Sequence, residues 1–207
     1  MDFTADQIQS FRYWIQGYQN FYEPIVEECF RLDGYRVLRH PALVGRADIQ
    51  CIVDTLFDGH KRLGPELDTN AVIQHLKGRK RLQPDFLLQR GDQRFLAELK
   101  SWGGMGSGQF DMVSARHWFL KNTRNSAFLL VDWLEGKPIA GKLLVMSSRS
   151  PQHDSVLSLL RSQYQTQVEL LYLDDIYRNP QLAGTIERQL RYLDAAVAEL
   201  RQALGSP

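Results

Sequence analysis

The stretch PDFLLQRGDQRFLAELK, residues Pro84–Lys100, decides the fold. It contains two apolar runs, at 86–90 and 93–97, which are separated by the pair Gly91-Asp92. A Gly-X pair between two such runs is typical of a β-hairpin with a two-residue type II′ turn. Because both runs are almost continuously apolar, we expect the hairpin to belong to a sheet that is covered on both faces.

The expected register of this hairpin brings two acidic residues together. If Arg90 pairs with Gln93 across the turn, Asp85 lies directly opposite Glu98. Side chains alternate along a strand, so Glu98 and Lys100 share one face, about 7 Å apart. Like charges that face each other destabilise a strand pair, and a divalent cation between them removes the repulsion. The pattern therefore predicts a metal site, the alternative being an exposed hairpin that merely carries charges.

Composition limits the classes of protein that the chain can belong to. Its 207 residues are most simply one domain, and the hydrophobic fraction of 43% is ordinary for a soluble globular protein. The formal net charge of +1 means that a nucleic acid would have to be met by a local basic patch. With only Cys29 and Cys51, no apolar run long enough for a bilayer and no secretory signal, we expect a reduced, cytoplasmic protein without membrane contact.

Periodicity predicts the other elements. Helical spacing favours a helix over 20–33, and a strand is expected at 35–39. Further helices are predicted near 49–57, 72–76, 109–121, 154–163 and 185–204, and buried strands at 127–133, 141–146 and 168–173. Trp133 is expected in the core. The prediction is an α/β fold with a mixed central sheet flanked by helices.

The order of these elements and motifs resembles that of a known superfamily. The chain has an acidic residue on its first helix, a Pro-Asp pair and then a Glu-x-Lys motif; these residues are Glu23, Pro84-Asp85, Glu98 and Lys100. This order is similar to the signature of the PD-(D/E)XK phosphodiesterases, the restriction-endonuclease-like nucleases. Residues 22–30 with Gly34-Tyr35 resemble the first helix of the Mrr-type enzymes. The resemblance covers about 20–133. It implies a restriction-endonuclease-like core there, within one domain over 1–207, a helical insertion at about 41–83 and a C-terminal extension at about 139–207.

The resemblance also implies roles for individual residues. Asp85 and Glu98 would be metal ligands, with Lys100 as the catalytic lysine and Glu23 as an upstream helper acid; Glu27 is the reserve for that helper. Mg²⁺ prefers carboxylate oxygens, and the backbone carbonyl of Leu99 could add a further ligand; Mn²⁺ is expected to substitute. Such a metal lowers the pKa of a bound water and polarises a phosphoryl oxygen.

Two of these roles have structural alternatives. Lys100 could orient the attacking water and place positive charge near the transition state, or it could form an ordinary ion pair with a neighbouring carboxylate. Glu23 could complete a capping box at the start of its helix, where Asn20 is the capping residue.

A basic run precedes the hairpin and could contact a nucleic-acid backbone. It consists of Lys77, Arg79, Lys80 and Arg81, although such runs are often only solvated loops. The resemblance adds Gln109, Arg116 and Lys121, on the helix expected after a glycine-rich loop at 103–108.

The sequence thus leads to the hypothesis of a Mg²⁺-dependent nuclease that acts on DNA. Two alternatives stay open: a nucleic-acid-binding or protein-binding module with the same fold but no catalysis, and a hydrolase of another phosphodiester. The last predicted helix carries an apolar stripe that could pack on its own domain or form a homodimer. The stripe contains Ile186, Leu190, Leu193, Val197, Leu200 and Leu204.

Overall fold

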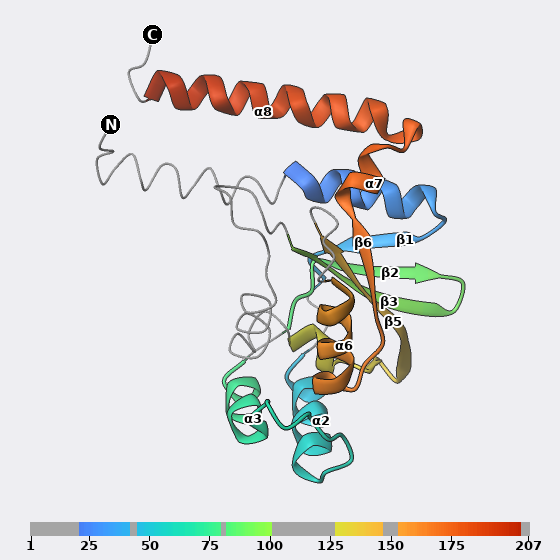
Figure 1. Cartoon of the computed structure of the whole chain (residues 1–207), viewed down its shortest axis with the longest axis vertical. Coiled ribbons are helices and arrows are strands. Elements are labelled where there is room, and N and C mark those ends of the chain that lie inside the picture. The colour runs from blue at the N-terminus through green and yellow to red at the C-terminus, as the bar shows by residue number, and fades with distance from the viewer. Residues whose placement is uncertain (1–20, 42–44, 80–81, 101–126, 147–152, 204–207) are drawn as a thin grey trace. The chain divides into compact units, whose positions relative to one another are not determined.

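The computed structural model describes residues 21–41, 45–79, 82–100, 127–146 and 153–203 (Figure 1). The chain divides into two compact units, one of residues 34–172 and one that joins 1–33 to 173–207. The helix expected at 109–121 and the glycine-rich loop before it lie outside the described residues. The single domain over 1–207 stays a prediction.

A mixed sheet forms the centre of the larger unit. Its first three strands are antiparallel neighbours in the order β1, β2, β3, and β3 continues into the parallel pairs β3–β5 and β5–β6. A short strand, β4, pairs antiparallel with the beginning of β5. The strands are β1 (Arg36–Arg39), β2 (Phe86–Arg90), β3 (Gln93–Lys100), β4 (Trp133–Leu134), β5 (Lys137–Met146) and β6 (Val168–Tyr172). The α/β class with a mixed sheet is confirmed.

The hairpin of β2 and β3 has the predicted register. Arg90 pairs with Gln93, and the pairing continues to Phe86 opposite Ala97. Gly91 has a φ of 59°, whereas Asp92 keeps a negative φ, which is the pattern of a type II′ turn. The turn therefore sets which residues face each other at the far end of the hairpin.

Helices of the larger unit pack on the sheet around one apolar core. They are α2 (Arg46–Phe57), α3 (Thr69–Lys77) and α6 (His153–Tyr164), and α2 and α3 lie side by side (Figure 1). Asp68 caps α3 because its carboxylate accepts the backbone N–H groups of Asn70 and Ala71. The core joins Val53, Leu76 and Leu160 from these helices to Leu96 and Leu144 from the sheet. Leu88 and Leu99 are buried as well, so the expectation of a covered hairpin is confirmed.

The strand predicted at 127–133 is wrong. Residues Ala127–Leu130 form a 3₁₀ helix, η1, and β5 instead occupies the place beside β3. A short run of buried apolar residues does not distinguish strand from helix by periodicity, which explains the error. Trp133 is 63% exposed, so its expected place in the core is also wrong.

The smaller unit is helical in its described part. Residues 21–32 form a helix whose buried side chains include Ile25, Val26 and Phe30. The C-terminal segment contributes α7 (Leu173–Tyr177), η2 (Pro180–Leu182) and α8 (Ala183–Ala203). Of the apolar stripe on α8, Leu190 is 47% exposed, and the homodimer stays a prediction. None of the helices in the described ranges combines the length and the apolar character needed to cross a bilayer.

Candidate active site

Asp85 and Glu98 meet at the open end of the β2–β3 hairpin. Asp85 directly precedes β2, and Glu98 lies in β3 at the position that the register places opposite it. The carboxylate of Glu98 accepts the backbone N–H of Asp85 at 3.2 Å. The carboxylate of Asp85 in turn accepts the backbone N–H of Leu99 at 2.7 Å. Each carboxylate is thus fixed by the main chain of the opposite strand.

Burial makes these two hydrogen bonds important. Glu98 is only 8% exposed and lies beside Leu144 of β5, while Asp85 is partly buried. A carboxylate that loses water needs hydrogen-bond donors or a cation to replace it. Backbone N–H groups provide some of these donors, and the two carboxylates concentrate negative charge at one end of the β2–β3 hairpin. The arrangement can hold a cation that prefers oxygen ligands.

His40 is a third polar residue at the same place. It follows β1, and its backbone N–H donates to the carbonyl of Asp85 at 2.8 Å. A ring nitrogen of His40 and a carboxylate oxygen of Asp85 lie within 4.8 Å of each other. The amide of Gln83 donates to the carbonyl of His40 at 2.9 Å, which helps to hold this segment. An imidazole beside the Asp85 carboxylate gives a mixed nitrogen and oxygen donor set, which suits Mn²⁺ as well as Mg²⁺.

The remaining predicted site residues are placed as follows. Lys100 ends β3 opposite Met146, and its side chain lies outside the described set. Leu99 is 2% exposed, and a metal-binding role for its carbonyl stays a prediction. Glu23 is 4% exposed on the helix of the smaller unit. Glu27, on the same helix, forms an ion pair with Arg31 at 2.6 Å, so the reserve acid has an ordinary structural partner.

The expected phosphate contacts are only partly described. Lys77 is exposed at the end of α3, and the guanidinium of Arg79 donates to a ring nitrogen of His75 at 3.2 Å. The other members of this set lie outside the described residues: Lys80, Arg81, Gln109, Arg116 and Lys121. The basic cluster therefore stays a prediction.

Sequence reasoning joined Asp85 to Glu98 and missed His40. Continuing the β1–β2 register beyond Arg39 and Phe86 places His40 opposite Asp85, but this register is known only from the structure, and no local motif announces it. No family model, no curated protein and no solved structure matches this chain.

Proposed function

We propose that this protein is a Mg²⁺-dependent nuclease that hydrolyses phosphodiester bonds in DNA. The observation that supports it most is the pair of crossed hydrogen bonds between Asp85, Glu98 and the backbone of the opposite strand. These bonds hold two carboxylates at one end of a rigid hairpin. A rigid strand pair positions metal ligands better than a loop does.

Asp85 and Glu98 would hold the metal, with the carbonyl of Leu99 as a further oxygen donor. When bound, Mg²⁺ or Mn²⁺ supplies Lewis acidity toward a phosphoryl oxygen and favours ionisation of water. The backbone N–H groups of Asp85 and Leu99 already occupy one lone pair on each side chain, which fixes the direction of the others. The chain thus contributes orientation of its ligands before any cation binds.

Lys100 and Glu23 complete the proposed machinery. Lys100 lies two residues after Glu98 on β3, where its ammonium would orient the attacking water and offset charge that develops on the phosphate. Glu23 would be the helper acid of the metal site, a role that rests on the resemblance in sequence. Phosphate contacts would come from Lys77, Arg79 and the neighbouring cations of the basic run.

A restriction-endonuclease-like core is part of the same proposal. It is supported by the antiparallel β1–β2–β3 order, followed by a crossover to the parallel strand β5. Under this proposal, the segment 41–83 is an insertion after β1, and it includes α2 and α3.

A binding module without catalysis is the second candidate, and one observation favours it. The hydrogen bonds that would orient the two carboxylates toward a metal also join the beginning of β2 to the end of β3. Both carboxylates therefore have a structural role that needs no metal. In that case the native protein would bind its partner without cleaving DNA.

Cleavage of plasmid, linear duplex and single-stranded DNA tests the proposal. We expect cleavage with Mg²⁺ or Mn²⁺ and none with EDTA. The variants Asp85→Asn, Glu98→Gln and Lys100→Ala should each lose at least about a hundredfold in rate, in line with the loss of a metal ligand or of transition-state charge.

Asp92→Asn provides the matched control. It also neutralises one carboxylate of the same hairpin, but in the exposed turn at the opposite end. This variant should cut DNA at the native rate. Cleavage that survives EDTA or Lys100→Ala would reject the nuclease, and binding of DNA without cleavage would favour the module.

A further inference from the structure

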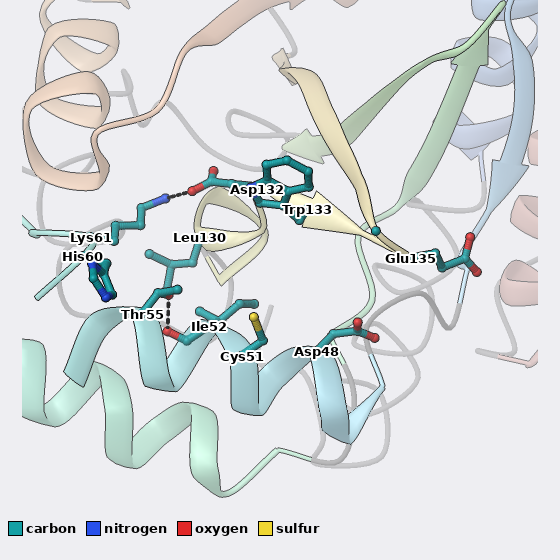
Figure 2. Close-up of a pocket in the computed structure, with 11 residues that line it drawn as sticks. Asp48, Cys51, Ile52, Thr55, His60, Lys61, Leu130, Asp132, Trp133 and Glu135 are labelled. Atoms are coloured by element: carbon teal, nitrogen blue, oxygen red, sulfur yellow. Dashed lines mark hydrogen bonds and ion pairs between the residues drawn. The ribbon is translucent and has the colours of Figure 1, made fainter. Parts of the chain in front are cut away.

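A pocket of about 470 Å³ opens at a second place in the larger unit (Figure 2). Its floor is one face of α2, including Cys51 and Ile52, and its opposite wall is the segment from Leu130 to Trp133. Lys61, in the loop after α2, closes one side. The volume lies within the range of small-molecule sites in proteins.

This pocket is separate from the Asp85–Glu98 site. Trp133 pairs with Pro138 near the beginning of β5, whereas Glu98 pairs with Leu144 near its end. Leu144 lies six positions after Pro138 in β5, which corresponds to about 20 Å along the strand. A ligand in the pocket would therefore not touch the proposed metal ligands.

Two buried ammonium groups share one carboxylate at the pocket wall. Lys61 contacts one oxygen of Asp132 (Figure 2). Lys142 donates to the other oxygen at 2.8 Å. The side chain of Lys61 is 11% exposed and that of Lys142 is 2% exposed. Burial lowers the pKa of Lys142 to about 8; Asp132 raises this pKa, and the charge of Lys61 lowers it. When both lysines are protonated, the three side chains together carry one excess positive charge, although the side chain of Asp132 is 42% exposed.

The excess charge is directed toward the pocket. Lys142 also donates to the carbonyl of Leu129, so its ammonium is engaged on two sides. For Lys61, Asp132 is the side-chain partner within the described ranges, and an ammonium has three donors. Lys61 therefore has donors to offer to an anionic group of a ligand, which would also balance the charge.

The two acids on the other side of the pocket are already used. The carboxylate of Asp48 accepts the backbone N–H of Gly45 at 3.1 Å, at the beginning of α2. Glu135 forms an ion pair with Arg94 at 3.0 Å. The guanidinium of Arg94 offsets the charge of Glu135, and the N–H of Gly45 occupies one oxygen of Asp48. Lys61 is the one Lys or Arg among the described residues of the lining, so an anionic group of a ligand would meet it first.

The rest of the lining favours a flat, apolar group. Trp133 is 63% exposed and offers its indole at the edge of the pocket, while Ile52 and Leu130 are buried apolar residues of the lining. Exposed indole faces bind planar rings by stacking. A ligand that combines an anionic group with a planar ring matches both parts of the site.

We propose that this pocket binds a nucleoside monophosphate unit, with its phosphate on Lys61 and its base against Trp133. His60, which also lines the pocket beside Lys61, provides a second donor to the phosphate. The unit could be a free nucleotide or one nucleotide of a nucleic-acid strand. The inference goes beyond the proposed nuclease activity and does not depend on it.

Calorimetric titration in EDTA tests the proposal without any contribution from a metal site. The ligands are the four deoxynucleoside monophosphates, deoxyadenosine, ribose 5-phosphate and a short 5′-phosphorylated oligonucleotide. At least one mononucleotide or the oligonucleotide should bind, about tenfold or more tightly than the base-only and phosphate-only ligands, because both contacts contribute. If the oligonucleotide binds more tightly than every mononucleotide, the natural ligand is a nucleic-acid strand. If a mononucleotide binds equally or more tightly, the natural ligand is a free nucleotide.

Variants connect the binding to this pocket. Trp133→Ala and Lys61→Met should each weaken the affinity about tenfold or more, and Lys61→Arg should keep most of it. Phe57→Ala is the matched control, because Phe57 is an aromatic residue of α2 that is 76% exposed and does not line the pocket. If Lys61→Met fails to fold, Trp133→Ala still tests the proposal, because Trp133 is exposed and its replacement leaves the core intact. Absence of binding, or binding that Trp133→Ala leaves unchanged, overturns the proposal.

Discussion

The carboxylates of Asp85 and Glu98 each accept a hydrogen bond from the backbone of the opposite side of the hairpin. The Glu98 carboxylate accepts the N–H of Asp85, and the Asp85 carboxylate accepts the N–H of the residue after Glu98, at 3.2 and 2.7 Å. Two acids at the end of one hairpin are thereby oriented in advance. Their mutual repulsion is the reason to expect a cation, and their hydrogen bonds are the reason to expect that the hairpin forms without one.

The stability of Glu98 variants in EDTA distinguishes repulsion from hydrogen bonding. Glu98→Gln keeps an acceptor for the N–H of Asp85 and removes a negative charge, so its free energy of unfolding should equal or exceed that of the native protein. Glu98→Ala leaves that N–H without this acceptor, which costs about 1–3 kcal/mol. Denaturant unfolding of both variants measures the difference. A loss of stability in Glu98→Gln as large as that in Glu98→Ala would show that the charge itself is needed for folding.

His40 should decide which metal supports activity. Imidazole favours transition metals over Mg²⁺, and the His40 ring lies close enough to Asp85 to share a cation with it. In His40→Ala, cleavage with Mn²⁺ should fall more than cleavage with Mg²⁺, so the ratio of the two rates shifts toward Mg²⁺. His60→Ala, at a histidine of the separate pocket, is the control. An unchanged ratio in His40→Ala would exclude the ring from the site.

Stability should depend on pH in alkaline solution through two opposing groups. Burial lowers the pKa of Lys142 from 10.5 to about 8, so the unfolded chain holds a proton that the folded chain lacks between these values, and stability rises with pH. Burial, with a smaller effect of Asp33, raises the pKa of Cys29 from 9.0 to about 11, so stability falls with pH across that window.

Two variants separate these contributions. In Cys29→Ala the free energy of unfolding should rise between pH 8 and 10.5, and in Lys142→Met it should fall between pH 9 and 11. Chemical denaturation at several pH values gives both slopes. If the free energy of unfolding of Cys29→Ala falls between pH 8 and 10.5, the lowered pKa of Lys142 is contradicted.

Removal of Asp132 should cost much more than removal of Lys142. Burial acts to raise the pKa of Asp132, but the charges of Lys142 and Lys61 and their hydrogen bonds lower it overall. Asp132→Asn leaves two ammonium groups without their shared carboxylate, at a cost of about 2 kcal/mol, which is below the value for a fully buried pair because the Asp132 side chain is 42% exposed and screened by solvent. Lys142→Met leaves Asp132 paired with Lys61 and should cost less than about 1 kcal/mol. Equal losses in urea unfolding would show that Asp132 does not act as the shared partner.

Local chemistry explains why the hairpin could be predicted from the sequence. Gly91 supplies the positive φ of the turn, the turn sets the pairing of Arg90 with Gln93, and the period of two then places Asp85 opposite Glu98. Every step uses residues close together in the chain. The same reasoning failed at Ala127–Leu130, where four buried apolar residues fit a 3₁₀ helix as well as a strand.

The parts that escaped prediction depend on pairing over long separations. His40 reaches Asp85 only because β1 pairs with β2 across the segment 41–83, and its histidine alone carries no signal for that pairing. Lys61 and Asp132 lie 71 residues apart, and neither occurs in a motif. Charged residues in loops are usually solvated, so the pairing of Lys61 with Asp132 could be recognised only from the fold.

Calorimetric titration of Mn²⁺ and Mg²⁺ into the metal-free protein tests most directly whether Asp85 and Glu98 hold one ion. We predict one site per chain for Mn²⁺ in the native protein and in Asp92→Asn, and loss of that site in Asp85→Asn and Glu98→Gln. A native protein that binds no divalent cation, or one whose binding Glu98→Gln leaves unchanged, would contradict the account.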